Sequence, residues 1–170
     1  GKLSEAEVLY RESLASRQRV LGPDHLDCIS SVNNLAICLA CQGKLSDVEV
    51  IFRENLASRQ RVLGPDHPDS ISSVNNLALC LRKQGKLSEA EVLFRENLAS
   101  FQHVLGPDHP GSISSVHNLA SCLDDQGKLS EAEVLYRESL ASRQRVLGPD
   151  HPGSINSIND LAICLRNQGT

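Results

Sequence analysis

Apolar residues recur every three to four positions along the chain, which is the spacing of one face of an α-helix. In residues 1–21 they fall at Leu3, Ala6, Leu9, Tyr10, Leu14, Val20 and Leu21, and in residues 27–42 at Ile29, Val32, Leu35, Ala36 and Leu39. Gly22 and Pro23 separate these stretches, because glycine suits a helix C-terminus and proline cannot continue a helix. Ser4 and Glu7 fit a capping box at the start of the first helix. The pattern therefore predicts two helices joined by a short loop.

The helix pair is repeated along the whole chain. The sequence Gly-Lys-Leu-Ser begins at Gly1, Gly43, Gly85 and Gly127, and Gly169 opens a further copy. This defines repeats over residues 1–42, 43–84, 85–126 and 127–168, in which 25 of 42 aligned positions are identical and 17 vary. Helix pairs without strands predict an all-α, right-handed α-solenoid of antiparallel helix pairs, with eight helices in one solenoid over residues 1–170. We expect it to be a fragment of a longer array.

One helix pair, residues 71–105, carries the residues of a known repeat pattern. Leu77 and Ala78 fill the positions of a Leu-Gly/Ala pair, Gly85 the turn, Ala90 the small residue at the helix crossing, and Phe94 the aromatic position. The pattern resembles the tetratricopeptide repeat, in a form longer than the usual unit of ~34 residues. The sequence of the repeat is similar to the repeats of kinesin light chains and to the repeat tails of NB-ARC or NACHT signalling ATPases. This resemblance implies a protein-binding scaffold in which the helix at residues 27–42, and its equivalents, line a concave groove.

The positions that vary between repeats gather on one face of that groove-lining helix. In the first repeat they include Asn33, Asn34, Ile37, Ala40 and Cys41, whose spacing keeps them together on the helix surface. We interpret this stripe as a peptide-binding surface with contacts specific to each repeat, and relaxed drift on a solvated face is the alternative. The predicted groove residues are Asn33, Asn34, Asn75, Asn76, Leu79, Arg82, Lys83, His117, Asn118, Ser121, Asp124, Asp125, Asn159 and Arg166.

Two features of the stripe bear on the ligand. An Asn side chain offers donors and an acceptor, so Asn34, Asn76 and Asn118 can hold an extended peptide backbone, or can form local hydrogen bonds on the helix surface. Arg82 and Lys83 in the second repeat contrast with two aspartates at the same positions of the third. An acidic segment would suit the former and a basic segment the latter.

Composition excludes several other functions. The net charge of −4 argues against a sequence-independent grip on nucleic acid, which needs a strongly basic face. No apolar run approaches the ~20 residues of a membrane span. The sequence holds no Walker motif, no G-x-G-x-x-G and no nucleophile elbow. We therefore predict a protein that is not an enzyme, needs no cofactor, and binds neither nucleic acid nor membrane.

The cysteines and histidines are predicted to be structural. Four cysteines share one position on the groove-lining helices, and we expect buried free thiols there, typical of a reducing, cytoplasmic setting; these are Cys38, Cys80, Cys122 and Cys164. Each repeat has a single Asp-His loop, at His25, His67, His109 and His151. A metal site needs three or four converging ligands, so we expect a loop-fixing hydrogen bond and no metal. Phe101 replaces an arginine and is expected to cover the edge of the core.

The leading hypothesis is a scaffold that binds an extended peptide in its groove. The alternative is an oligomerisation or sensor module of a STAND-type signalling ATPase, where the repeats stack on themselves or on the ATPase. The first and last helices lack partners, so we also expect head-to-tail self-association between their exposed faces. The identity of the partner does not follow from the sequence.

Overall fold

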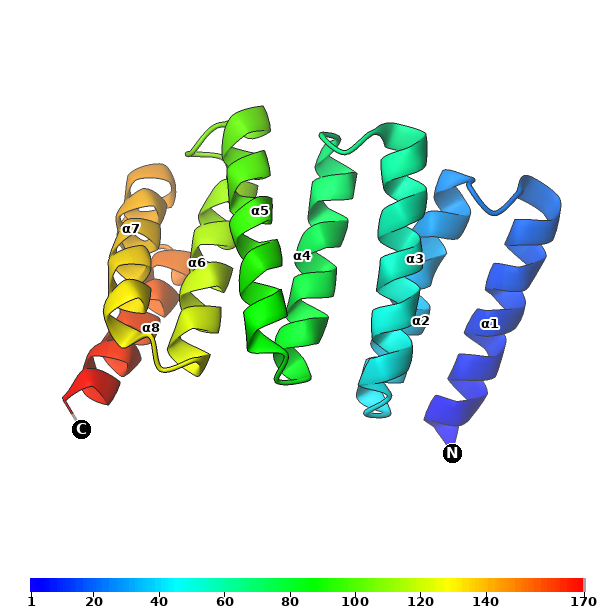
Figure 1. The fold of residues 1–170 in the computed structure, drawn as a ribbon, viewed down its shortest axis with the longest axis horizontal. Coiled ribbons are helices and arrows are strands. Elements are labelled where there is room, and N and C mark those ends of the chain that lie inside the picture. Colours follow the sequence, from blue (N-terminus) through cyan, green and yellow to red (C-terminus); the bar gives the residue numbers. More distant parts are fainter. Residues whose placement is uncertain (170) are drawn as a thin grey trace. The chain divides into compact units, whose positions relative to one another are not determined.

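The computed structural model describes residues 1–169, with the side chain of Leu26 left out, and this part of the chain forms eight α-helices and no strand (Figure 1). The helices have the lengths and order that the sequence predicts. The chain divides into two compact units of two repeats each, an N-terminal unit over Gly1–Gln84 and a C-terminal unit over Gly85–Thr170. Each unit is described by itself.

The N-terminal unit holds α1 (Lys2–Leu21), α2 (Leu26–Cys41), α3 (Leu45–Leu63) and α4 (Pro68–Lys83). Each helix packs against the next one in sequence, α1 on α2, α2 on α3 and α3 on α4. Leu35, Ala36 and Leu39 of α2 form the core with Val48 of α3 and Cys80 of α4. Leu35, Ala36 and Leu39 belong to the apolar stripe that the sequence predicts for α2, and Val48, equivalent to Ala6 of α1, joins them together with Cys80.

The C-terminal unit repeats this arrangement with α5 (Leu87–Leu105), α6 (Pro110–Asp125), α7 (Leu129–Leu147) and α8 (Pro152–Gln168). Consecutive helices again pack against each other. Leu119, Ala120 and Leu123 of α6 are buried together with Ala132 and Tyr136 of α7. The same columns, meaning aligned positions of the repeat, therefore make the core of both units.

The turn between repeats is fixed by a glycine. Gly43 has a φ of 77°, the left-handed region that favours glycine, and it follows the end of α2. The amide of Lys44 donates to the carbonyl of Leu39 at 3.0 Å, and that of Gly43 donates to Ala40 at 3.0 Å. This pair of bonds is the Schellman motif, which satisfies carbonyls at the end of a helix and turns the chain.

The histidine of each loop caps the helix that follows. His67 has extended backbone angles, and its Nδ1 accepts a hydrogen bond from the amide of Asp69 at 3.2 Å. His25, His109 and His151 do the same at 3.0–3.2 Å. The predicted loop-fixing hydrogen bond is thus confirmed, as an N-cap that occupies one of the free amides at the start of the helix.

The predicted capping box is wrong. Ser4 lies inside the first turn of α1, whose N-cap is Gly1, and its equivalent Ser46 lies inside the first turn of α3, whose N-cap is Lys44; no side chain caps either helix end. The Schellman turn already brings the chain into helical geometry at Leu45, so the helix begins before the serine is reached. The glutamate of the predicted box is used elsewhere: Glu7 accepts hydrogen bonds from Lys44 and Gln42.

Candidate functional site

In the N-terminal unit, the predicted groove residues lie on the parts of α2 and α4 that the core leaves uncovered. Asn34 and Lys83 are exposed, and the other predicted residues of this unit are half-buried; these are Asn33, Asn75, Asn76, Leu79 and Arg82. Ile37, at a variable position of α2, exposes 63% of its surface. The helix period places them there because the apolar stripe faces α1 and α3.

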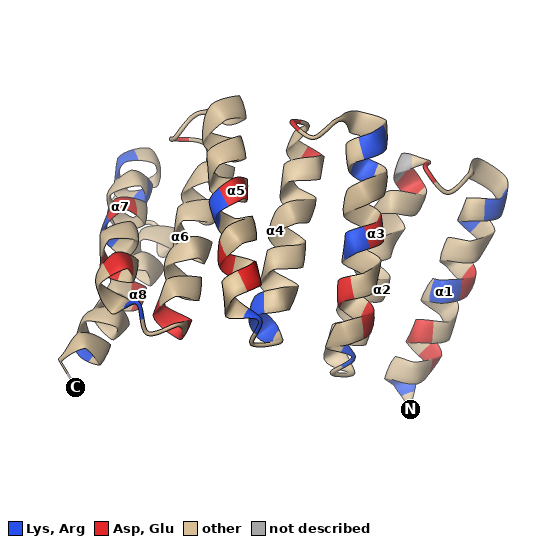
Figure 2. Cartoon of the chain, in the orientation of Figure 1, with Lys and Arg blue, Asp and Glu red and all other residues tan. Residues whose placement is uncertain are grey.

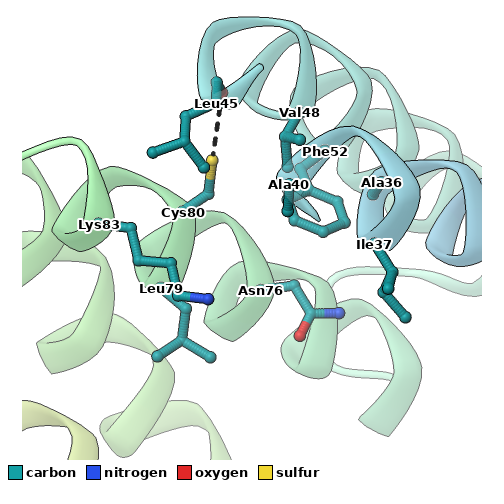
Figure 3. A pocket seen from close by; sticks show the side chains of 10 residues that line it. All are labelled: Ala36, Ile37, Ala40, Leu45, Val48, Phe52, Asn76, Leu79, Cys80 and Lys83. Carbon is teal, nitrogen blue, oxygen red and sulfur yellow. Dashed lines mark hydrogen bonds between the residues drawn. The ribbon is translucent and has the colours of Figure 1, made fainter. Parts of the chain in front are cut away.

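Three of these residues meet at one cavity. Asn76, Leu79 and Lys83 of α4 line a hollow of about 180 Å³ together with Ile37 and Ala40 of α2. Figure 3 shows Ile37 and Leu79 extending from their helices to the same side, with the amide of Asn76 beside them. The floor of this cavity is the core of the unit, where the thiol of Cys80 donates to the carbonyl of Leu45 at 3.5 Å.

In the C-terminal unit, residues at positions that vary between repeats contact one another. The Tyr136 hydroxyl on α7 hydrogen-bonds the Ser121 hydroxyl on α6 at 3.1 Å. The ring of His117 packs edge-on against Tyr136, with ring centroids 5.7 Å apart. His117 Nδ1 also lies 3.7 Å from a carboxylate oxygen of Asp160 on α8. The variable columns thus form a connected polar cluster here.

Ser121 is less accessible than the other predicted groove residues of this unit. It is only 9% exposed and therefore does not present its side chain to solvent in a groove. The cause is Tyr136, which occupies the aromatic column of the following helix and brings a hydroxyl group to the serine. Ser121 is a packing residue in this structure, whereas Asp125, Asn159 and Arg166 are exposed as expected and His117, Asn118 and Asp124 are half-buried.

The charges of the two units differ at the C-terminal ends of these helices. α4 ends in Arg82 and Lys83, whereas α6 ends in Asp124 and Asp125. Figure 2 shows the end of α4 in blue and that of α6 in red. One oxygen of Asp124, Oδ1, is buried without a hydrogen-bond partner within the described chain. The two units therefore offer different electrostatic surfaces to a ligand.

A second cluster, which sequence reasoning missed, ties successive repeats together. The Glu7 carboxylate accepts from Lys44 Nζ at 2.7 Å, from Gln42 Nε2 at 3.0 Å and from Arg11 Nε at 2.9 Å. Hydrogen bonds from these three side chains lower the pKa of Glu7 to about 2, with that from Lys44 making the largest contribution. Glu91 is held the same way by Lys128, Gln126 and Arg95, and its pKa is also lowered to about 2.

The signal for this cluster was present in the sequence. Gln42 is one of the invariant columns, and its side chain reaches back to the carbonyl of Leu3 at 3.2 Å. Asn55 is buried and donates to the carbonyl of Ile29 at 2.6 Å, so it fixes α3 on α2. An invariant polar position inside a helical repeat, such as that of Gln42, indicates a structural hydrogen bond, but its partner, 39 residues away, follows only from the fold.

The predicted roles of the cysteines and of Phe101 are confirmed. The four cysteines of the repeated column are buried free thiols, and each donates to a leucine carbonyl at 3.4–3.6 Å. Burial raises the pKa of the Cys164 thiol. Phe101 is buried and stacks on His109 at 6.4 Å between ring centroids. Across the described residues, no group of three or more His, Cys, Asp or Glu side chains could hold a metal ion.

None of the helices in the described chain combines the length with the apolar character that crossing a bilayer requires.

The fold and the exposed helix faces together define a helical-repeat solenoid. Models of the tetratricopeptide repeat match residues 1–27, 28–69, 49–99, 70–145 and 117–169. The chain belongs to the tetratricopeptide repeat family, whose repeats generally mediate protein–protein interactions and typically form non-catalytic scaffolds.

Solved structures with the same fold support this assignment. A putative kinesin light chain from Podosopora anserina, with nearly identical TPR-like repeats, is 25% identical and superimposes with a TM-score of 0.85, over 99% of this chain and 80% of that one. BtubC (BKLC) from P. vanneervenii is 23% identical, with a TM-score of 0.84 over 99% of this chain and 67% of that one. Among curated proteins, none matches the sequence.

Proposed function

We propose that the chain is a protein-interaction scaffold that binds an extended peptide segment on the exposed face of α2 and α4, with the equivalent face of α6 and α8 as a further contact surface. The cavity beside Asn76, Leu79 and Lys83 carries this proposal, since it joins variable residues of two successive repeats in one hollow. A hollow lined by apolar residues with a few polar groups at its edge is typical of a ligand site.

Asn76 supports a peptide as the ligand. Its amide lies at the edge of the cavity, where it can donate to a peptide carbonyl and accept from a peptide amide. Such paired contacts hold a backbone in an extended conformation whatever its side chains are. Arg82, in the last turn of the same helix, adds a positive charge to the C-terminal end of α4.

A random peptide library displayed on phage tests this function. We expect the wild-type chain to enrich peptides, and the double variant Asn76→Ala, Arg82→Ala to bind a resynthesised selected peptide at least about tenfold more weakly. The control is Glu12→Ala with Arg19→Ala, two exposed positions on α1. Thermal melting by circular dichroism shows whether each variant folds. Enrichment of no peptide, or equal affinity for the groove variant and the control, would overturn the proposal.

Self-association is a second proposal, carried by a repeated sequence. Residues 1–25 and 127–151 are identical, so the α1 segment has the sequence of a helix that packs on α6. In α7 that packing buries Tyr136, whereas the equivalent Tyr10 of α1 is 40% exposed. On α8, Ile158 is 46% exposed, although the equivalent Val116 of α6 is buried. The α1 face of one copy is therefore complementary to the α8 face of another.

Sedimentation velocity over a roughly hundredfold range of concentration tests this contact, because mass action drives association. We expect the average mass of the 170-residue chain to rise with concentration, and Ile158→Glu to abolish the rise. Val50→Glu, at an exposed position on α3, is the matched control. Ile163 of α8 is also exposed but does not serve as a control, because it lies on the groove side of that helix. A mass that stays monomeric throughout the range would refute the contact.

A further inference from the structure

The N-terminal cavity has an apolar floor and apolar walls. Val48 of α3, which is only 3% exposed, forms the floor with Ala36. Ile37, Phe52 and Leu79 form the walls (Figure 3). A cavity of about 150 Å³ with apolar walls is large enough to hold benzene. The volume of this cavity is about 180 Å³. The size fits one branched aliphatic side chain.

Ala40 keeps this cavity open. It is the smallest of the four residues in its column, where the other repeats have Arg82, Asp124 and Arg166. Its side chain lines the hollow between α2 and α4, so a longer residue at this position would enter the space. The cavity thus depends on a substitution that the first repeat alone carries.

The edge of the cavity has polar groups on one helix. Asn76, Leu79 and Lys83 follow one another at spacings of three and four residues, so they lie along one side of α4. Lys83 is exposed and is the charged residue among those that line the hollow. An amine at the edge of an apolar site favours a ligand that places a carboxylate beside its apolar group.

The equivalent positions of the C-terminal unit have the opposite chemistry. Ile37 corresponds to Ser121, Ala40 to Asp124, Asn76 to Asp160 and Lys83 to Asn167. The formal charge of this set is +1 in the N-terminal unit, from Lys83, and −2 in the C-terminal unit, from the two aspartates. Ser121 is bonded to Tyr136, and Asp160 lies beside His117. Two units built from similar repeats therefore differ at the residues that would touch a ligand.

We propose that the N-terminal cavity is the anchor subsite for a leucine, isoleucine or valine side chain of a partner protein's extended segment, with an aspartate or glutamate next to it bound by Lys83. This inference rests on the proposed peptide-binding function and names the chemistry of its ligand. Burial of the aliphatic side chain supplies affinity, and the ion pair with Lys83 sets which neighbouring residue is accepted.

Selection from random octapeptides displayed as amino-terminal fusions tests the subsite, since no peptide then ends in a free carboxylate. We expect the wild-type chain to enrich a Leu, Ile or Val within two residues of an Asp or Glu. Ala40→Asp, which introduces the residue of the third repeat, is expected to remove the aliphatic preference. Lys83→Glu is expected to replace the acidic preference by Lys or Arg.

Two controls separate binding from folding. Ala40→Ser changes the volume little and is expected to retain the aliphatic preference. Lys83 is exposed, so Lys83→Glu tests the charge preference even where Ala40→Asp lowers the melting temperature. A resynthesised selected peptide is expected to lose at least about tenfold in affinity for each of the two charged variants.

Each outcome of the selection has one meaning. If the enriched peptides share a different motif, one that does not pair an aliphatic residue with an acidic residue, this inference is overturned and the proposed function stands. The predicted motif with unchanged preferences in both charged variants would place the peptide elsewhere and overturn it as well. Enrichment of no peptide would overturn the proposed function together with the subsite.

Discussion

Lys44 of the second repeat donates from Nζ to Oε2 of Glu7 in the first repeat, at 2.7 Å. The equivalent pair in the C-terminal unit, Lys128 and Glu91, is 2.8 Å apart. In both units the lysine is the N-cap of a helix, α3 or α7, and the glutamate lies in the equivalent helix of the preceding repeat, α1 or α5. The bond therefore spans a repeat boundary, and its loss loosens the contact between successive repeats and not the helices themselves.

Acid should weaken this contact in a defined pH range. Glu7 and Glu91 have a pKa of about 2 in the folded chain, against the ordinary glutamate value of 4.5. A carboxylate whose folded pKa is lowered stabilises the fold above the unfolded pKa, and this contribution is lost as the pH falls through the folded value. We expect the urea midpoint to fall progressively between about pH 4.5 and pH 2.

The double variant Glu7→Gln, Glu91→Gln is the comparison for this prediction. It removes the two carboxyl groups whose pKa is about 2 and keeps the shape of the side chains, so its urea midpoint should depend less on pH in the same range. The control variant Glu12→Gln, Glu54→Gln alters two exposed glutamates. Its urea midpoint should depend on pH as that of the wild type does. Equal pH dependence for all three proteins would mean that the clusters do not stabilise the folded chain.

The N-cap hydrogen bonds of the loop histidines predict how substitutions of these histidines change the free energy of unfolding. His67 accepts a hydrogen bond from the amide of Asp69 through Nδ1, at the start of α4. His67→Ala should lower the free energy of unfolding by about 0.5–2 kcal/mol, the usual range for a lost cap, whereas His67→Asn should retain most of it because asparagine caps well. Urea denaturation followed by circular dichroism measures both.

His103 is the matched control for the caps, because it is an exposed histidine near the end of α5. His103→Ala should leave the urea midpoint unchanged. If His67→Asn is as destabilising as His67→Ala, the histidine acts through packing of its ring and not through the hydrogen bond.

The sequence was sufficient to predict the helices and the repeat. Gly22 and Pro23 mark one helix end, and the apolar period over residues 27–42 identifies the face that packs in the core. These signals are local, because capping and periodicity act within one or two helical turns. The two-unit division and the partners of the polar columns depend on contacts between repeats, which no local signal encodes.

The candidate site was predicted only in part, for the same reason. Asn76, Leu79 and Lys83 were found because they share one helix face, and the cavity they line needs Ile37 and Ala40 of another helix. Ser121 has the same helical position as Ile37 and is nevertheless buried. The aromatic column decides this: Tyr136 brings a hydroxyl that bonds the serine, whereas Phe52 has none.

The buried asparagine of the second repeat predicts a stabilising substitution in the fourth. Asn55 donates to the carbonyl of Ile29 at 2.6 Å, whereas the equivalent Ser139 is buried and its hydroxyl has no hydrogen-bond partner in the described chain. Ser139→Asn should restore the bond, to the carbonyl of Ile113, and raise the free energy of unfolding by about 0.5–1.5 kcal/mol. Urea denaturation measures this change.

Ser139→Ala tests the cause of that gain. It removes the unpaired hydroxyl without adding a bond, so it should leave the stability near the wild-type value or raise it slightly. Destabilisation by Ser139→Asn would mean that α7 packs too closely on α6 at this position for the larger amide.

Phe101 and Gly111 should be energetically coupled. A Cβ at Gly111 would lie 2.8 Å from Cε1 of Phe101, closer than carbon atoms normally approach, and the ring is held by its stack on His109. Gly111→Ala should therefore destabilise the wild-type chain by about 1–3 kcal/mol, as overpacking usually does. In a Phe101→Arg background, which has the residue of the other three repeats, the same change should be neutral or stabilising by about 0.5–1 kcal/mol, since alanine favours a helix over glycine.

A double-mutant cycle measured by urea denaturation gives the coupling directly, and residues in contact show values of about 0.5–3 kcal/mol. Gly153→Ala is the control, because the equivalent Cβ in the fourth repeat meets His151 Nδ1 at 3.2 Å and the preceding helix has Arg143 in place of the phenylalanine. It should cost less than Gly111→Ala in the wild-type chain. Additive effects of Phe101→Arg and Gly111→Ala would show that the ring moves aside freely. A coupled pair would instead mean that glycine at position 111 compensates for the one aromatic residue that replaces arginine in this column.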